Sequence, residues 1–172
     1  VDIGNTSTKF GVFDGDRLVL KVSIPTVREV TAEGLAAVLS SRLPTNITDA
    51  IVCSVVPETD TAMLDHLRSA YSIKPQFISN DLDFGFTINY TPLDAVGTDR
   101  LVNAFSAVET YGVPCVVCSF GTALTIDAVD AHRNLLGGII APGMKAMARA
   151  LSELASRLPE VDVERTGQVI QN

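Results

Sequence analysis

The sequence has no excess of basic residues: lysines and arginines number 13, aspartates and glutamates 20, and the formal net charge is −7. Surfaces that bind nucleic acid or anionic membranes need positive charge, so this balance argues against both kinds of partner. The sequence also has no apolar run long enough to span a bilayer, and no signal-peptide pattern. We therefore expect a cytoplasmic protein with no nucleic-acid or membrane partner.

Cysteine and histidine are also scarce. The three cysteines, Cys53, Cys115 and Cys118, lie in apolar, strand-like runs with no metal-ligand spacing beside them. This pattern predicts buried, reduced thiols in a cytosolic protein. His66 and His132 have no second ligand or nucleophile at a useful spacing, and we expect both on the surface.

The composition is that of a folded chain, with 47% hydrophobic and 19% charged residues among 172, which suits one domain or two small ones. Apolar and β-branched runs and helical spacing alternate along the sequence, and this alternation predicts a mixed α/β fold. Strands are expected at 1–3, 9–14, 17–24, 50–56, 75–79, 86–90, 115–120, 123–130 and 135–140, and helices at 31–43, 59–71, 98–111 and 142–157.

The first candidate site is the polar turn Gly4-Asn5-Thr6-Ser7-Thr8, which lies between two predicted strands. A glycine lets the backbone approach a ligand closely, and backbone N–H groups and hydroxyls in such a turn can hold phosphate oxygens. Asp2, just before the turn, can hold Mg²⁺ through water, because Mg²⁺ prefers carboxylates and retained waters. An ordinary hairpin with an Asn/Gly/Thr turn is the alternative interpretation.

A second stretch, residues 116–129, has the same layout of strand, polar turn and strand. Its turn is Ser119-Phe120-Gly121-Thr122-Ala123. Two such units suggest two similar half-molecules that face one cleft. A nucleotide held between two such turns is the arrangement of sugar kinases and actin.

Several motifs together resemble the type III pantothenate kinases of the acetate and sugar kinase, Hsp70 and actin superfamily. Residues 2–6, Asp-Ile-Gly-Asn-Thr, resemble the first phosphate motif D-[VI]-G-N-T, and residues 120–123 resemble D-F-G-T-A. Residues 90–92 and 97–100 resemble the substrate motifs Y-x-x-P and G-A-D-R, and residues 137–143 resemble G-G-x-I-x-P-G at the adenosine end of the cleft. The order and spacing of these motifs run the length of the chain.

The resemblance implies an actin-like ATPase (ribonuclease H-like) fold with duplicated domains, each a mixed sheet flanked by helices. One domain would span residues 1–95, with the first phosphate turn at 2–9. The other would begin at residue 96, with its turn at 119–123, and continue to 172 without its C-terminal helices. The family also implies a homodimer. We expect the apolar side of helix 142–157, with Met144, Met147, Leu151 and Leu154, to be buried in the second domain or against another chain.

The implied activity is ATP-dependent phosphorylation of pantothenate to 4′-phosphopantothenate, the first step of coenzyme A biosynthesis, with ATP and Mg²⁺. Asp99 matches the general base that takes the proton of the substrate hydroxyl; a helix N-terminal cap is the alternative. Arg100 is expected to pair with the pantothenate carboxylate or the phosphoryl group, or to form a surface salt bridge. Tyr90, Gly97 and Thr98 complete the implied substrate site. The implied ATP and phosphate site comprises Asp2, Gly4, Asn5, Thr6, Ser7, Thr8, Lys9, Gly121 and Thr122; Lys9 reaches either phosphate or solvent.

Ser119 departs from the family pattern, in which an aspartate at this position holds a monovalent cation, K⁺ or NH₄⁺. Serine keeps one oxygen and loses the charge, and Asp127, eight residues on, is not expected to replace it, so cation activation is not expected to follow the family pattern. Two alternatives to the kinase therefore stay open. One is a catalytically impaired nucleotide-binding subunit or partner protein. The other is a superfamily kinase that acts on a sugar or an acid.

Overall fold

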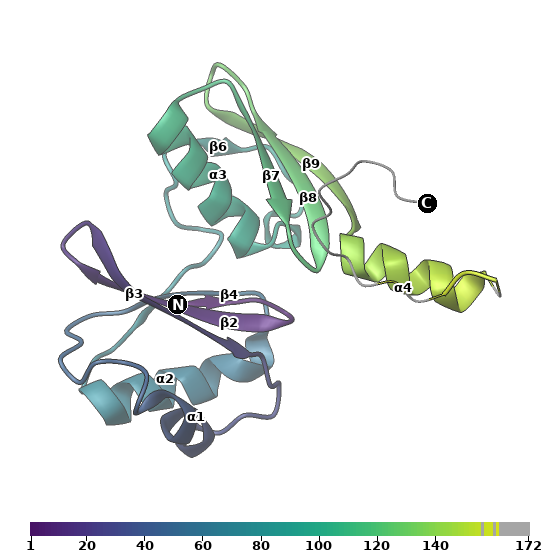
Figure 1. The fold of residues 1–172 in the computed structure, drawn as a ribbon. Helices are drawn as coiled ribbons and strands as arrows, with labels where there is room; N and C mark the ends of the chain where they lie inside the picture. Colours follow the sequence, from purple (N-terminus) through teal and green to yellow (C-terminus); the bar gives the residue numbers. More distant parts are fainter. Residues whose placement is uncertain (156, 160, 162–172) are drawn as a thin grey trace.

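The computed structural model describes residues 1–155, 157–159 and 161 (Figure 1). Predicted and observed elements agree in type and order, and α3 has the predicted bounds. In chain order the elements are β1 (Asp2–Ile3), β2 (Ser7–Asp14), β3 (Arg17–Pro25), α1 (Ala32–Leu39), β4 (Ile51–Ser54), the 3₁₀ turn η1 (Pro57–Thr59), α2 (Asp60–Tyr71), β5 (Gln76–Phe77), β6 (Thr87–Ile88), the 3₁₀ turn η2 (Leu93–Ala95), α3 (Thr98–Tyr111), β7 (Cys115–Phe120), β8 (Ala123–Val129), β9 (Asn134–Pro142) and α4 (Met144–Leu154).

The first sheet has five strands in the order β3-β2-β1-β4-β5. Its central strand β1 pairs antiparallel with β2 and parallel with β4, and β4 pairs parallel with β5. β2 and β3 form the predicted hairpin, in which Asp14 pairs with Arg17. Gly15 takes a φ of 59° in this turn, a left-handed conformation that glycine adopts at no steric cost.

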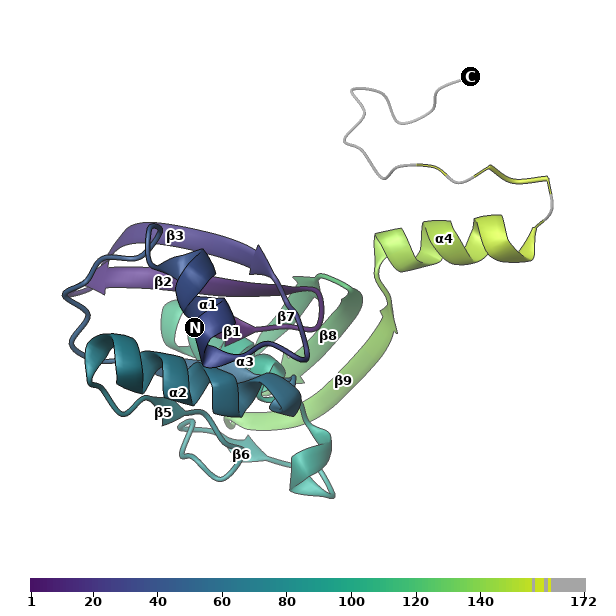
Figure 2. The same ribbon diagram turned by 90° about the horizontal axis from the view of Figure 1, so that it is seen from below.

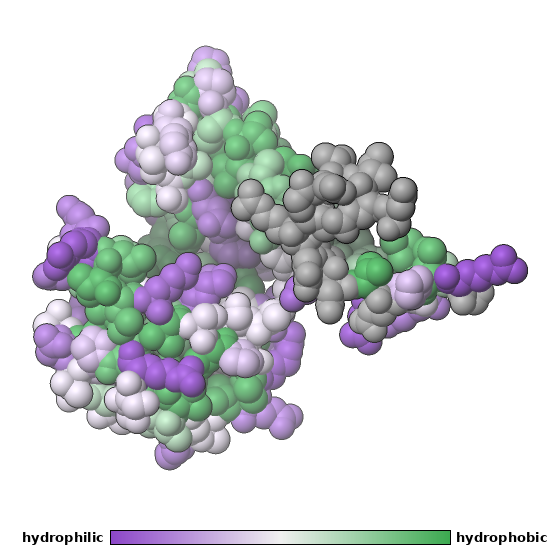
Figure 3. All heavy atoms as spheres, in the orientation of Figure 1, coloured by the Kyte–Doolittle hydropathy of each residue, from purple (hydrophilic) through white to green (hydrophobic). Residues whose placement is uncertain are grey.

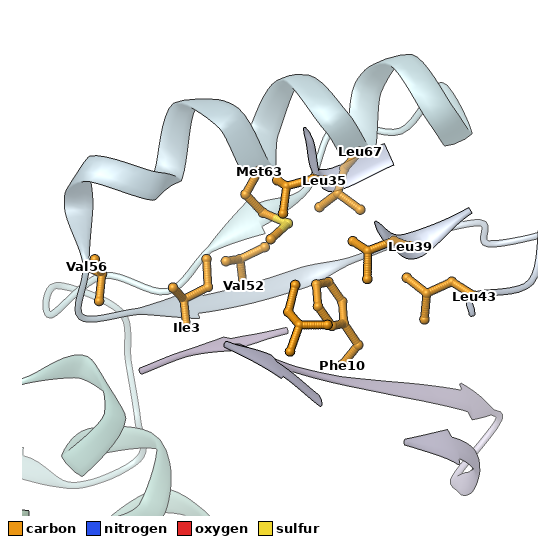
Figure 4. Close-up of a cluster of buried hydrophobic side chains, with 10 residues drawn as sticks. Ile3, Phe10, Leu35, Leu39, Leu43, Val52, Val56, Met63 and Leu67 are labelled. Atoms are coloured by element: carbon orange, nitrogen blue, oxygen red, sulfur yellow. The ribbon is translucent and has the colours of Figure 1, made fainter. Parts of the chain in front are cut away.

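Helices α1 and α2 lie together on one face of the first sheet, as Figures 1 and 2 show. Thr31 caps α1 as predicted, because its hydroxyl accepts a hydrogen bond from the Gly34 amide at 3.1 Å. The helices and the sheet enclose one apolar core (Figure 4). Its buried members are Ile3, Phe10, Ile24, Leu35, Leu39, Leu43, Val52, Val56, Met63 and Leu67.

The second sheet has four strands in the order β6-β9-β8-β7. β7, β8 and β9 are antiparallel neighbours, and the short strand β6 pairs parallel with β9. α3 packs against β7 and β8 and also contacts β4 of the first sheet. The buried core here comprises Phe84, Val96, Leu101, Ala104, Val108, Val129 and Leu135. The expected mixed α/β class, with two mixed sheets flanked by helices, is confirmed, whereas the division between residues 95 and 96 stays a prediction.

The outer face of the second sheet corrects one expectation about the cysteines. Cys53 is buried and Cys115 is half-buried, but Cys118 is exposed. The reason is the alternation of β7, which turns Val116, Cys118 and Phe120 outward, with 72% of Phe120 exposed. Figure 3 shows apolar residues on the part of the surface that this sheet forms.

Of the two arrangements expected for helix α4, burial within the second domain is not found among the described residues, and burial against another chain stays a prediction. The helix extends away from both sheets in Figures 1 and 2, and none of its residues is buried. Met144, Met147, Leu151 and Leu154 are 54, 43, 57 and 88% exposed, so the second sheet and its helix do not cover the apolar side of α4. The C-terminal end of the predicted helix 142–157 lies partly outside the described residues. No described helix has the length and apolar character needed to cross a membrane.

The expectation that His66 lies on the surface is wrong. His66 is only 2% exposed, because the spacing of α2 places it beside Met63 and Leu67 on the buried side of the helix. Neither ring nitrogen has a hydrogen-bond partner within the described residues. The ring meets Tyr71 edge-on, with 6.1 Å between the centroids. Burial of the ring lowers the pKa of His66 below its ordinary 6.5.

We predict that this buried imidazole makes the fold sensitive to acid. The unfolded chain binds a proton on His66 more readily than the folded one, so stability falls as the pH drops through about 6.5. Wild type should melt at a lower Tm at pH 5.5 than at pH 7.5, and His66→Leu should show a smaller difference. Each kcal/mol corresponds to about 2–4 °C in a chain of this size. His132→Leu, at an exposed position, is the control; a difference in His66→Leu equal to that of wild type contradicts the prediction.

Candidate functional site

The first predicted phosphate turn joins β1 to β2. The Gly4 amide donates a hydrogen bond to the Ser7 carbonyl at 3.1 Å, which closes the turn. Asn5 and Thr6 are exposed at its tip, whereas Thr8 is buried. The Thr8 hydroxyl lies 2.9 Å from the Thr26 hydroxyl, inside the protein. The tip of the turn is therefore open to a ligand, and Thr8 has a supporting position behind it.

The second predicted turn joins β7 to β8, where Gly121 and Thr122 are exposed. The Gly121 amide donates to the Ala123 carbonyl at 3.0 Å, and the Gly143 amide donates to the Thr122 carbonyl at 2.9 Å. A Cβ on Gly143 would lie 2.1 Å from the Gly121 carbonyl oxygen, so only glycine fits against the turn at this position. The start of α4 therefore packs directly on the second turn.

The two turns meet in the folded chain. The hydroxyls of Thr6 and Thr122, 116 positions apart in sequence, lie 2.6 Å from each other. Either hydroxyl can donate in this contact, which uses one of the two hydroxyl protons and leaves the other for an acceptor such as a phosphate oxygen. Two exposed hydroxyls brought together by two backbone turns form a site at which an anion could be bound from both sides.

Asp2 and Lys9 lie beside the first turn on neighbouring strands, where the register pairs them directly. The Lys9 ammonium donates to Asp2 Oδ2 at 3.0 Å, with about half of each side chain exposed at 48 and 49%. Lys9 thus contacts the acid rather than only solvent. A cation bound at Asp2 would compete with this ammonium, because both interact with the same carboxylate.

The N-terminus of α3 is anchored to the end of β4 by Thr98. The Thr98 hydroxyl donates to the Ser54 carbonyl at 3.0 Å, and the Cys53 thiol contacts the same hydroxyl at 3.6 Å. Burial raises the pKa of the Cys53 thiol, and the charges of Asp2 and Asp99 raise it further. Asp2 pairs with Cys53 across β1 and β4, and Thr98, next to Asp99, contacts the Cys53 thiol, so the two acids lie in one region of the molecule.

Asp99 lies in the first turn of α3 and is half-buried. Its Oδ1 accepts a hydrogen bond from the Arg100 amide at 2.9 Å, while Oδ2 has no partner within the described residues. A Cβ on Gly97 would lie 2.5 Å from Asp99 Oδ1, so the absence of a side chain at 97 makes room for this carboxylate. One oxygen of Asp99 is thus held by the helix terminus and the other remains available for chemistry.

Arg100 is expected from sequence to contact substrate or to form a surface salt bridge, but it forms a buried ion pair. It is 4% exposed and pairs with Asp127, which is 3% exposed. Arg100 Nε donates to Asp127 Oδ1 and Oδ2 at 3.1 and 3.0 Å, and Nη2 donates to Oδ1. The hydrogen bonds to Asp127 raise the pKa of Arg100. The guanidinium carbon also lies 6.0 Å from the centre of the Tyr90 ring.

Ser119 lies on β7 opposite Thr125 and faces an open groove between β7 and α3. The polar side chains of Asn103, Ser106 and Thr110 line the same groove. Among the described residues, no group of three or more histidine, cysteine or acidic side chains has a geometry that would hold a metal ion. Asp127 pairs with Arg100 and belongs to the interface between α3 and β8.

Sequence reasoning named Asp127 only as a substitute cation ligand and missed its pairing with Arg100, for which a charged residue at an inward position of a mostly apolar strand was the signal. It missed Thr26 entirely. No sequence signal pointed to Thr26, yet its hydroxyl donates to the Gly4 carbonyl at 2.6 Å and its amide donates to the Thr6 carbonyl at 3.1 Å. Because its only hydroxyl proton is used there, Thr26 accepts the proton of Thr8. Thr26 therefore supports the first turn from behind.

Comparison with known proteins gives three consistent results. The sequence model of the family described as type III pantothenate kinase matches residues 1–172. The protein of that name from Agathobacter rectalis is 37% identical over 176 residues, which cover 99% of this chain and 68% of the relative. The one from Koribacter versatilis is 34% identical over 186 residues, with coverages of 99 and 68%. The chain thus spans about two thirds of the length of these relatives.

The solved structures give a likeness of fold. A crystal structure of a conserved Campylobacter jejuni protein, assigned to the Baf family of transcriptional activators, superposes with a TM-score of 0.56. The match covers 97% of this chain and 66% of that chain, with 21% sequence identity. At this identity the comparison concerns the arrangement of helices and strands alone.

Proposed function

Since the chain belongs to the type III pantothenate kinase family, we propose that it phosphorylates pantothenate to 4′-phosphopantothenate with ATP, the first step of coenzyme A biosynthesis. The contact between Thr6 and Thr122 carries the proposal, because it brings two polar turns from separate sheets to one place. Phosphoryl transfer depends on holding the phosphates and placing an acceptor hydroxyl in line with them.

The phosphate-binding role belongs to the two turns. In the first, the residues from Gly4 to Ser7 supply backbone amides, an amide side chain and hydroxyls, with Thr8 as support. In the second, Gly121 and Thr122 supply the same kind of groups. Asp2 fits Mg²⁺, since one half-exposed carboxylate, phosphate oxygens and waters form a donor set that this ion accepts. Bound Mg²⁺ would neutralise phosphate charge. Lys9 would then turn from Asp2 toward the phosphates or solvent.

Asp99 is proposed as the general base. Its free oxygen lies at the N-terminus of α3, which Thr98 joins to the β4 end beside Asp2. From there it would take the proton of the pantothenate hydroxyl as that oxygen attacks phosphorus. Gly97, Thr98, Tyr90 and Arg100 are proposed to form the substrate side of the site. In this role Arg100 is held in place by Asp127, with its guanidinium over the Tyr90 ring.

The function is tested by incubating the protein with Mg-ATP and pantothenate and following ADP release and the mass of the product. We expect formation of 4′-phosphopantothenate. Nucleotide binding without turnover would support the alternative, a nucleotide-binding subunit or partner protein, and turnover of a sugar or acid alone would support another superfamily kinase. The kinase names of the relatives favour pantothenate.

Ser119 bears on the monovalent cation. We propose weak or absent activation by K⁺ or NH₄⁺, because a neutral hydroxyl does not supply the charge of an aspartate and Asp127 already pairs with Arg100. In an assay at constant ionic strength, replacing Na⁺ by K⁺ should change the wild-type rate little, while Ser119→Asp should create or strengthen activation. A native protein that requires K⁺ at low concentration would mean that other groups bind the ion.

The proposal extends to the domain organisation, the oligomeric state and the cellular location. The consecutive antiparallel strands β1-β2-β3 and β7-β8-β9 support two duplicated actin-like halves, divided near residue 95. The uncovered apolar side of α4 supports a homodimer, which light scattering tests; a monomer at micromolar concentration would contradict it. A cytoplasmic location stays a prediction.

A further inference from the structure

Arg28 lies next to the first phosphate turn, although no sequence motif pointed to it. It follows β3 in a loop, two positions after Thr26, whose hydroxyl and amide fix that loop to the carbonyls of Gly4 and Thr6. Arg28 Nη2 donates to Asn5 Oδ1 at 3.0 Å, and Nη1 donates to Glu58 Oε1 at 2.9 Å. The guanidinium thus connects the tip of the turn to the 3₁₀ turn η1, where Glu58 lies.

The chemistry of the two groups fixes which side of the Asn5 amide faces Arg28. A guanidinium has only donors, so the amide atom that it contacts must be the carbonyl oxygen. The amide nitrogen, with its two protons, then points away from Arg28. A donor at the exposed tip of the turn, beside the Thr6 hydroxyl, is what a phosphate oxygen requires.

Glu58 keeps Arg28 in this position. Both side chains are about half exposed, at 56% for Arg28 and 54% for Glu58. An exposed ion pair of this kind adds little to the free energy of unfolding. What the pair does here is hold the Arg28 guanidinium in one orientation. A planar guanidinium holds its N–H donors in a fixed fork, so its two acceptors set its orientation, whereas a lysine ammonium is a point charge on a flexible stem.

We propose that Arg28 is a positioning residue that orients the Asn5 amide toward the nucleotide phosphates and is itself held by Glu58. This inference rests on the proposed function, since it assigns a partner to a residue of the proposed ATP site. Direct contact of Arg28 with a phosphate is the competing mechanism. The two differ at Glu58: if Arg28 acts through Asn5, removing the Glu58 charge loosens the amide and weakens ATP binding. If Arg28 contacts phosphate, removing that charge releases the guanidinium and strengthens ATP binding.

The test measures Mg-ATP binding, KM for ATP, KM for pantothenate and Tm for wild type and variants. Arg28→Gln should raise KM for ATP by about tenfold, the effect of one charge-assisted hydrogen bond. Glu58→Gln should raise it by about two- to fivefold, because an exposed ion pair contributes less than such a bond. KM for pantothenate and Tm should stay near wild type. In an Asn5→Ala background, Arg28→Gln should add less than a twofold effect on Mg-ATP binding, because its target is gone. Arg17→Gln, which removes a surface ion pair in the β2-β3 hairpin, is the matched control.

Three results would overturn the inference while leaving the kinase in place. They are an unchanged KM for ATP in Arg28→Gln, a lower KM for ATP in Glu58→Gln, and a full Arg28→Gln effect in the Asn5→Ala background. A lower Tm with unchanged KM values would mean that Arg28 has only a structural role, which overturns it as well. A wild-type protein that binds no Mg-ATP overturns the proposed function and this inference together.

Discussion

Replacing Asp99 by asparagine is expected to lower kcat by roughly 10²–10⁴-fold, the usual contribution of general-base catalysis. Asparagine has nearly the same size, and its Oδ1 can still accept the Arg100 amide proton that Asp99 accepts at 2.9 Å. The helix terminus should therefore survive the change. Mg-ATP binding should also stay close to wild type, because the phosphates are bound by the turns rather than by this carboxylate.

The structure makes this a discriminating experiment, since Asp99 does accept a hydrogen bond from the first turn of α3. If that bond were its whole role, asparagine would serve almost as well and turnover would barely change. Coupled ADP release with pantothenate, run beside a thermal melt, separates the two roles by orders of magnitude. Asp65→Asn, at an exposed position on α2, is the control. A rate near that of wild type in Asp99→Asn would remove this residue from the mechanism.

Removing the carboxylate of Asp127 is expected to have the largest effect on stability. Asp127→Ala leaves the guanidinium of Arg100 buried without its acid, a change that costs about 3–5 kcal/mol. In a chain of this size the loss corresponds to a Tm lower by roughly 6–20 °C. The control is Glu109→Ala, which removes the acid from a half-exposed pair with Arg133; there we expect at most about 1 kcal/mol.

A double variant separates packing from substrate binding at the same pair. Arg100→Met with Asp127→Leu replaces both charges by apolar groups of similar volume, so most of the lost stability should return. If Arg100 contacts pantothenate, the folded double variant should still have a raised KM for pantothenate and an unchanged KM for ATP. If the double variant has wild-type KM values, Arg100 and Asp127 serve the fold alone. If Asp127→Ala has a wild-type Tm, the predicted contribution of this ion pair to stability is wrong.

Local chemistry made much of the fold predictable from sequence. The Gly15 turn, the Thr31 cap and the bounds of α3 depend on residues close together in the chain, and the structure has them as expected. The same holds for the two polar turns, because glycine, asparagine and threonine between β-rich runs prefer such conformations. The family resemblance depends on the order of short motifs, which folding does not alter.

Burial and pairing across long separations could not be inferred in this way. Helical spacing predicts which residues share a side of α2, but only packing on the first sheet decides that His66 lies on the buried side. Likewise, the sequence shows an acid in β8, but only the packing of α3 on this strand shows that Asp127 is the buried partner of Arg100. α4 shows the opposite case: its apolar stripe predicts burial, yet none of its residues is buried within the described part of the chain.

The sequence by itself determined the class of fold, the two turns and the family, since these depend on local conformational preference and on motif order. The tertiary structure alone decided which polar groups meet. It brought Thr6 to Thr122, Thr26 to Gly4 and Arg28 to Asn5. Each of these contacts joins residues that are distant along the chain, so their distance depends on how the strands pair and how the sheets pack, which no local pattern encodes.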